Sequence, residues 1–220
     1  MNKSPKLIVM LTYNDITVKD ATSIFEACKN TKAEYFGIKE KGINKNEIIK
    51  LIKKIKDSGK KTVFEIVAYE EEECLSGVHL AKECESDMIM GTVYYPSVHE
   101  YCMNNNIKYM PFTGIVSGRP SVLEGSCDEI INEAKSLAQK GVMGFDLLAY
   151  RYKGDGDELC RRFISEVNTE VCIAGGIDSF EKIERLKIAA PTYFTIGSAF
   201  FDKKFGSDFP EQINKVLEYL

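Results

Sequence analysis

The sequence predicts an α/β fold, a single (β/α)8 TIM barrel that takes up residues 1–220. Short apolar runs alternate with helical segments along the whole chain, eight such pairs can be counted, and no linker or low-complexity segment separates them. Strands that alternate with helices imply right-handed crossovers and a parallel sheet. Eight units in 220 residues suit a closed barrel at the small end of its range, and an open doubly wound sheet is the main alternative.

Several predicted strands are apolar on both faces, as in the segments LIVML and DMIM. Such runs are typical of parallel strands that are covered on both sides. The spacing between strand starts leaves room for one helix in each gap. The eight predicted strands are Lys6–Thr12, Glu34–Lys39, Thr62–Ala68, Met88–Val93, Lys108–Thr113, Gly144–Ala149, Val171–Ala174 and Tyr193–Ile196.

Helix starts are marked by a capping residue that is followed three positions later by Glu. Two serine pairs fit the strict capping box, Ser97/Glu100 and Ser126/Glu129. Close variants occur at Asn44/Glu47, Asp155/Glu158, Asp178/Glu181 and Asp208/Glu211. The predicted helix ends are Gly59, Gly141 and the Ala190–Pro191 step.

The charge and hydropathy of the chain argue against two classes of protein, those that bind nucleic acids and those that span a membrane. The net charge of −4 argues against a nucleic-acid-binding protein, but a few local cations suffice for an anionic small molecule. No apolar run approaches the roughly 20 residues of a membrane-spanning helix, and the start Met1–Lys6 has no signal-peptide pattern. We therefore expect a cytoplasmic protein without nucleic-acid or membrane partners, for which a homodimer is one possible assembly.

The seven cysteines and two histidines do not predict a metal site. The cysteines are odd in number, irregular in spacing and form no CxxC pair, so we interpret them as reduced thiols, buried or half-buried. His79 and His99 are too few and too far apart in sequence for a metal cluster, and no dinucleotide-binding fingerprint is present. The sequence therefore predicts no metal and no other cofactor.

Small residues follow the last two predicted strands, in the segments VCIAGGID (171–178) and YFTIGSAF (193–200). Loops at this end of the last two barrel strands often bind phosphate. Gly175 and Gly176 let the backbone approach an anion, while Gly197 and Ser198 open a helical turn whose N–H groups carry partial positive charge. These four residues are the predicted phosphate-binding site. Tight turns and crowded packing also demand glycine at strand ends, so a purely structural role is the alternative.

A Gly-Gly pair after the seventh predicted strand and a Gly-Ser pair after the eighth resemble the ribulose-phosphate-binding barrel superfamily. That group includes histidine- and tryptophan-biosynthesis barrels, hexulose-phosphate and keto-gulonate-phosphate lyases, and pentose-phosphate and sugar-phosphate epimerases. The resemblance implies that Gly175, Gly176, Gly197 and Ser198 carry a phosphate. The Asp-x-Lys-x-x-Asp pattern of the decarboxylase and hexulose-phosphate synthase group is absent, with Thr62–Glu70 in its place, as are the paired histidines of the metal-dependent epimerases.

Three charged residues lie within apolar strands: Lys39, Glu65 and Asp146. A charge in such a strand must find a partner or costs several kcal/mol, so we expect these side chains to be the catalytic acids and bases. Lys39 could alternatively form a Schiff base if its pKa is lowered. The structural alternative is a salt-bridged layer, such as Lys39 with Glu65, that only fixes the packing inside the barrel.

The remaining candidates lie at the rim of the predicted site. Substrate contacts are expected from Asn14, Thr113 and Arg151. The loops Val116–Gly125 and Arg151–Gly156 are interpreted as lids over a ligand or, equally, as mobile surface loops. His99 could reach the site as an acid or base, although a histidine in a first helical turn more often has no such role, and His79 is expected to be structural.

Two hypotheses of function follow. The first is a phosphate-binding TIM-barrel enzyme that acts on a small phosphorylated sugar or related metabolite as an isomerase, epimerase or aldolase-type lyase, by acid–base chemistry without a metal. The second is a non-catalytic barrel that senses a phosphorylated metabolite, since the glycerol-operon antiterminator barrels resemble this chain near its Ala-Gly-Gly segment. Both imply a phosphorylated small molecule as the binding partner, and turnover separates them.

Overall fold

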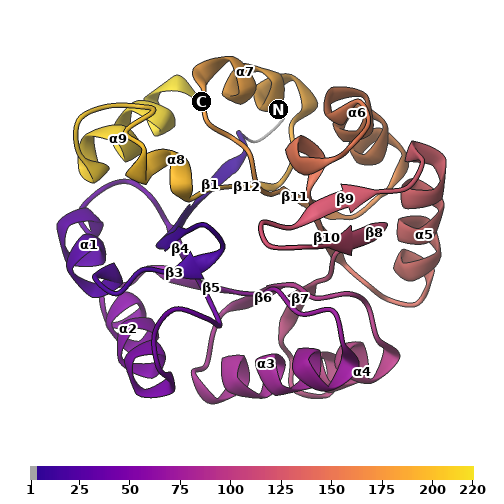
Figure 1. Ribbon diagram of the computed structural model, residues 1–220, viewed down its shortest axis with the longest axis horizontal. Helices are drawn as coiled ribbons and strands as arrows, with labels where there is room; N and C mark the ends of the chain where they lie inside the picture. Colours follow the sequence, from indigo (N-terminus) through magenta and orange to yellow (C-terminus); the bar gives the residue numbers. More distant parts are fainter. Residues whose placement is uncertain (1–3) are drawn as a thin grey trace.

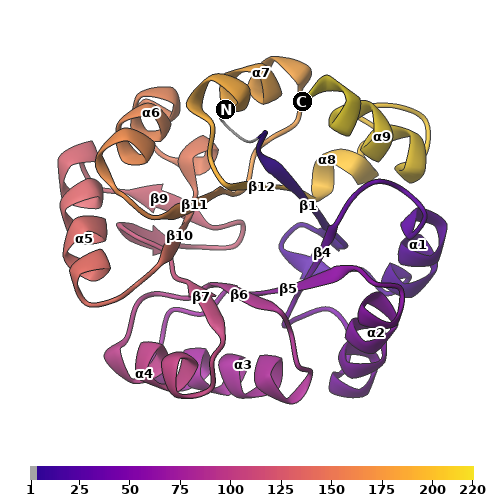
Figure 2. The same ribbon diagram turned by 180° about the vertical axis from the view of Figure 1, so that it is seen from behind.

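The computed structural model describes residues 4–220. Part of the segment Met1–Lys6, which was predicted to lack a signal-peptide pattern, therefore lies outside the described residues. Within residues 4–220, eight parallel strands form one sheet in the order β10–β11–β12–β1–β4–β5–β6–β7, which follows the chain around a ring. Figures 1 and 2 show these strands at the centre and the helices around them. The (β/α)8 TIM barrel that the sequence predicts is confirmed.

Each predicted strand overlaps one strand of the barrel. The strands are β1 (Lys6–Met10), β4 (Tyr35–Lys39), β5 (Lys61–Ile66), β6 (Met88–Gly91), β7 (Lys108–Met110), β10 (Gly144–Leu147), β11 (Glu170–Ile173) and β12 (Tyr193–Ile196). Several end before the predicted carboxyl boundary, because the chain leaves the sheet there to build the loops of the rim.

The barrel closes between β7 and β10 through a reduced pairing. Phe112 and Asp146 form one parallel bridge, and the Asp146 N–H donates to the Pro111 carbonyl at 2.9 Å. Pro111 itself has no N–H group to donate, which limits how far the ladder can continue. The barrel is therefore nearly closed, and the pairing between β7 and β10 is its weakest strand contact.

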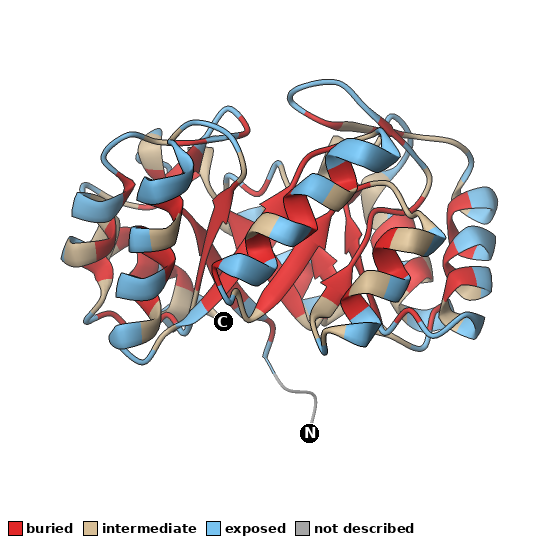
Figure 3. Ribbon diagram, turned by 90° about the horizontal axis from the view of Figure 1, so that it is seen from below, coloured by how far each residue is buried: buried red, intermediate tan, exposed pale blue. Residues whose placement is uncertain are grey.

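Helices cover the outside of the barrel. They are α1 (Ala21–Cys28), α2 (Lys45–Asp57), α3 (Glu71–Glu83), α4 (Pro96–Asn104), α5 (Cys127–Gln139), α6 (Gly156–Glu166), α7 (Phe180–Ala189), α8 (Ser198–Phe201) and α9 (Phe209–Tyr219), with a 3-10 turn η1 (Ala149–Arg151). Figure 3 shows buried residues in the strands and on the helix faces that pack against them, and exposed residues on the outer faces. This distribution is what an apolar stripe on each helix predicts.

Most of the predicted helix boundaries are confirmed. The cap hydrogen bonds are made by Asn44, Ser126, Asp155 and Asp208, and positive φ angles occur at Gly59, Gly141 and Ala190. The capping box predicted at Ser97 is wrong: Pro96 is already the first residue of α4, so Ser97 lies inside the helix and its hydroxyl donates to Glu71. The cap of α7 is Ser179 instead of Asp178.

The core has two parts. The larger part lies between the sheet and the helices, and the smaller part fills the barrel itself with Ile8, Met10, Val63, Met88, Met90, Met110, Cys172 and Tyr193. Six of the seven cysteines are buried and Cys127 is half-buried, as their positions in amphipathic segments predict. A barrel interior that is packed with side chains leaves room for a ligand only at its ends.

Two antiparallel hairpins that the sequence did not predict stand at the carboxyl end of the barrel. The first pairs β2 (Thr12–Tyr13) with β3 (Ile16–Thr17), and the second pairs β8 (Ile115–Ser117) with β9 (Val122–Glu124). The second hairpin occupies most of the loop that was interpreted as a lid or a mobile segment. Across residues 4–220, none of the helices has the length and apolar character needed to span a bilayer.

Candidate functional site

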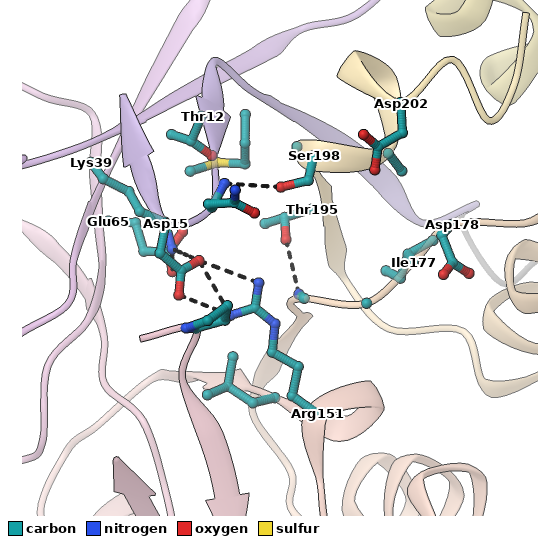
Figure 4. Close-up of a pocket in the computed structure, with 18 of the residues that line it drawn as sticks. Thr12, Asp15, Lys39, Glu65, Arg151, Ile177, Asp178, Thr195, Ser198 and Asp202 are labelled. Carbon is teal, nitrogen blue, oxygen red and sulfur yellow. Dashed lines mark hydrogen bonds and ion pairs between the residues drawn. The ribbon is translucent and has the colours of Figure 1, made fainter. Parts of the chain in front are cut away.

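A cavity of about 290 Å³ opens at the carboxyl end of the barrel. Its lining comes from the rim of β1, β4, β5, β11 and β12, from Arg151, and from Pro120 of the second hairpin. Figure 4 shows the polar side chains that point into it. Active sites of this fold lie at this end, and the volume lies near the lower limit of ligand pockets.

The floor of the cavity carries a buried ion network. Lys39 Nζ lies 2.8 Å from Asp15 Oδ1 and 2.9 Å from Glu65 Oε1, and the three side chains are 3 to 6% exposed. Lys39 and Glu65 are partners in the register of β4 and β5, so their side chains leave the sheet on the same face. The salt-bridged layer considered from the sequence is therefore present, and it also lines the cavity.

Asp15 connects this network to the rest of the rim. It lies in the turn of the β2–β3 hairpin, where Asn14 and Asp15 have φ angles of 48° and 62°, a conformation that Asn and Asp tolerate well. Its Oδ2 accepts a hydrogen bond from Arg151 Nη1 at 3.0 Å and from the Ser121 N–H at 3.0 Å. The Asp15 carboxylate thus connects the β2–β3 turn to Lys39, to Arg151 of η1 and to the second hairpin.

The charges of the network follow from these contacts. Burial alone would raise the pKa of Asp15, but Lys39 and Arg151 outweigh burial and hold that pKa well below its usual range. Burial alone would lower the pKa of Lys39, but Glu65 and Asp15 outweigh it and keep the pKa above its usual value. Lys39 is therefore an ammonium ion in this arrangement, which disfavours the Schiff-base alternative because that needs a lowered pKa.

Asp146 does not join the network. It is 1% exposed inside the barrel, in register with Cys172, and its two oxygens have no hydrogen-bond partner in residues 4–220. Burial raises its pKa strongly, and the negative charge of Glu65 adds to this effect. Asp146 is absent from the cavity lining and makes no hydrogen bond to Lys39 or Glu65, with which the sequence grouped it, although it lies close enough for their charges to affect its pKa.

The predicted phosphate loops form one wall of the cavity. Gly175 and Gly176 have φ angles of 75° and 71°, and Ser198 is the first residue of α8. A Cβ atom on Gly175 would lie 2.5 Å from Arg151 Nε, and one on Gly176 would lie 2.9 Å from the Tyr150 carbonyl oxygen. Glycine is therefore required here by backbone conformation and packing, and its small size also leaves the loop backbone open to the cavity.

Further polar groups complete this wall. The Ser198 hydroxyl accepts a hydrogen bond from the Asn14 N–H at 3.2 Å, and the Thr195 hydroxyl accepts one from the Gly175 N–H at 3.4 Å. Within residues 4–220, the N–H groups of Ser198 and Ala199, which begin the α8 turn, have no hydrogen-bond acceptor. These two donors are available to an anion.

The rim of the cavity has mixed charge. Asp178, Asp202 and Lys204 line it beside the glycine loops. Lys182 Nζ lies 3.0 Å from Asp178 Oδ1 and donates to the Gly176 carbonyl at 2.6 Å. The carboxylates disfavour a dianion at the rim itself, so an anionic group would be held deeper, at the loop N–H groups and Arg151.

Two other predicted residues lie away from the cavity. Thr113 is 2% exposed, and its hydroxyl donates to the Ile130 carbonyl at 3.1 Å, so it faces α5 instead of the ligand site predicted for it. His99 is buried and absent from the cavity lining, 3.4 Å from the Tyr94 hydroxyl, and burial lowers its pKa. His79 packs against Tyr101 on the outer ring, in keeping with a structural role.

Asp15 is the site residue whose importance sequence reasoning missed. The Asn14–Asp15 pair directly after the first predicted strand is a turn signal of the kind that joins two short strands. That signal identifies a hairpin, but it does not reveal that the carboxylate points inward onto Lys39. Over residues 4–220, no group of His, Cys, Asp and Glu side chains is arranged to hold a metal ion.

Comparisons with known proteins show the fold of the chain. No protein-family model matches it, and no curated protein sequence matches it. Among solved structures, it is similar to a tryptophan synthase complex from Pyrococcus furiosus, with a TM-score of 0.69, 17% identity, and coverage of 100% of this chain and 99% of that one. It is also similar to N-(5'-phosphoribosyl)anthranilate isomerase from Pyrococcus furiosus, with a TM-score of 0.61, 13% identity and 98% coverage of each chain.

Proposed function

We propose that the chain is an enzyme that binds a small phosphorylated metabolite at the carboxyl end of the barrel and isomerises or epimerises it. The observation that carries this proposal is the Lys39 ammonium, fixed at 2.8 and 2.9 Å between Asp15 and Glu65 in the same cavity as the glycine loops. The two structural neighbours named above, a tryptophan synthase and a phosphoribosylanthranilate isomerase, support a barrel enzyme through their fold alone.

The phosphate of the ligand would lie against Gly175, Gly176, Gly197 and Ser198. The N–H groups that begin α8 would donate to its oxygens, and the Ser198 hydroxyl would add a donor. Arg151, whose side chain crosses Gly175, would supply the positive charge. Asn14 would fix the position of Ser198 through its backbone.

The reacting carbon would lie over the ion network. Glu65 forms an ion pair with Lys39 and lines the cavity, so it would be the group that takes a proton from a carbon next to a carbonyl. The Lys39 ammonium would stabilise the negative charge that develops on the carbonyl oxygen. Asp15 would keep Lys39 charged and in place, and its own lowered pKa makes it a poor base. Aldol cleavage through a Schiff base is less compatible with a raised Lys39 pKa.

Thermal unfolding in the presence of phosphorylated sugars and their dephosphorylated counterparts tests the binding part of the proposal. A ligand at 100 times its Kd adds about 2.7 kcal/mol, or about 5–10 °C for a domain of this size. Ser198→Asp should abolish the shift, because it places a negative charge in the phosphate site. The matched control is Ser23→Asp, since Ser23 is exposed in the first turn of α1, away from the cavity, and should keep the shift.

Solvent exchange tests the chemical part. When the stabilising ligand is incubated with the protein in heavy water, NMR should show deuterium at the carbon next to its carbonyl group. Glu65→Gln should slow this exchange by about 10²–10⁴-fold. A ligand that binds without exchange or turnover would support the non-catalytic sensor instead. A panel in which phosphorylated and dephosphorylated compounds behave alike would refute the phosphate site.

A further inference from the structure

Four residues that join β8 to β9, Gly118–Ser121, form a bridge over the cavity that we call the strap. Pro120 of the strap lines the cavity together with the glycine loops, although it belongs to the segment that follows β7. Figure 1 shows the β8–β9 hairpin reaching in front of the barrel strands toward the centre of the ring. The strap therefore stands over the ligand space and not beside it.

One set of contacts fixes the inner side of the strap. The buried Ser121 N–H donates to Asp15 Oδ2 at 3.0 Å. The Tyr69 hydroxyl, which follows β5, donates to the Gly118 carbonyl at 2.6 Å and lies 2.9 Å from Ser121 Oγ. Both ends of the strap are thus hydrogen-bonded to other parts of the rim, to Tyr69 after β5 and to Asp15 in the β2–β3 turn.

Arg119 provides a second anchor. Its guanidinium lies 2.9 Å from Glu40 Oε1, at the end of β4, and donates to the Val67 carbonyl, after β5. The Glu40 carboxylate in turn accepts from the Val67 N–H at 3.2 Å. Because these partners belong to the barrel rim, the strap is held across the mouth from two sides.

We propose that the strap sets an upper limit on ligand size, so that the site takes a compact phosphorylated metabolite and excludes a phosphate ester that carries a nucleobase or another aromatic ring. This inference rests on the proposed phosphate site. A ligand with its phosphate at Gly176 and Ser198 extends toward Lys39 and Glu65, and Pro120 limits the space above that end. The cavity of about 290 Å³ is consistent with a compact ligand.

Shortening the strap tests the inference. Replacing Gly118–Ser121 by Asn-Gly keeps the Ser117–Val122 pair and closes the hairpin with a two-residue turn. Calorimetry would measure the binding of inorganic phosphate, glycerol 3-phosphate and adenosine 5'-monophosphate to this variant and to the wild type. A second variant, Arg119→Ala with Tyr69→Phe, keeps Pro120 but removes two anchors, and it serves if the shortened chain does not fold.

The wild type should bind inorganic phosphate and glycerol 3-phosphate but not the nucleotide. The shortened variant should bind the nucleotide at least about tenfold more tightly than the wild type, with phosphate affinity nearly unchanged, and the unanchored variant should gain about threefold. Equal nucleotide affinity in the wild type and both variants, with phosphate still bound, would overturn the role of the strap alone. Failure of the wild type to bind inorganic phosphate would overturn the phosphate site, and this inference with it.

Discussion

Replacing Lys39 by Met should destabilise the protein strongly, because it removes the cation that Asp15 and Glu65 share. At 2.8 Å, two unit charges interact by about 6 kcal/mol at an effective dielectric constant near 20, before the cost of burying them is subtracted. Breaking a buried ion pair typically costs about 3–5 kcal/mol, because a charge is left without its partner. For a domain of this size that loss lowers the melting temperature by about 6–20 °C.

Urea and thermal unfolding, followed by circular dichroism, would measure the effect of Lys39→Met. The matched control is Lys53→Met: Lys53 pairs with Asp57 on α2, but the two side chains are 72% and 62% exposed, so little change is expected. Adding Glu65→Leu to Lys39→Met should restore part of the lost stability, since an ion pair replaced by apolar residues is often neutral. A loss below about 1 kcal/mol for Lys39→Met would refute the buried network as a source of stability.

Three further predictions concern other parts of the barrel. Below its unfolded pKa near 3.8, protonated Asp146 makes its full contribution to stability, and this contribution is lost as the pH rises through the raised folded pKa. In urea unfolding, the stability of Asp146→Asn relative to the wild type should therefore increase as the pH rises above the unfolded pKa, by at most about 1.4 kcal/mol per pH unit, and a difference that does not change with pH would contradict the raised pKa. Gly175→Ala should lower the melting temperature more than Gly59→Ala does. Both residues have positive φ angles, but only a Cβ atom at Gly175 would clash with Arg151, so equal decreases would show that Arg151 moves freely. Ser126→Ala should cost about 1 kcal/mol in urea unfolding through the lost cap of α5, and no loss would mean that the cap contributes nothing.

The sequence alone was enough to predict the barrel. Eight apolar runs at helix-length intervals leave few topologies other than a ring of parallel strands, because consecutive parallel strands connect through right-handed helical crossovers. Local chemistry also set the helix starts at Asn44, Ser126, Asp155 and Asp208, since a cap depends on residues within one turn. The sequence predicted Ser97 as the cap of α4, but the helix already begins at Pro96. Proline suits the first position of a helix because its φ angle is fixed near the helical value.

The pairing of Lys39 with Glu65 could be inferred from the sequence because both are charged residues near the carboxyl ends of consecutive strands. Their register makes them neighbours on the same face of the sheet. The same argument could not place Asp146 or Thr113. Asp146 faces a packed interior without a partner, and Thr113 has left the strand and turned toward α5. The facing direction of a side chain near a strand end depends on where the strand stops, which periodicity does not fix.

The sequence by itself therefore determined the fold, the end of the barrel where a site can form, and the small residues of its loops. Only the tertiary structure decided that Asp15 joins Lys39, Arg151 and Ser121, residues that are 24, 136 and 106 positions away in the chain. The two hairpins that bring these groups together have strands of two or three residues, too short for an alternating pattern to be seen. Contacts of this kind arise when the closing barrel brings distant loops to one rim, which no local pattern in the chain records.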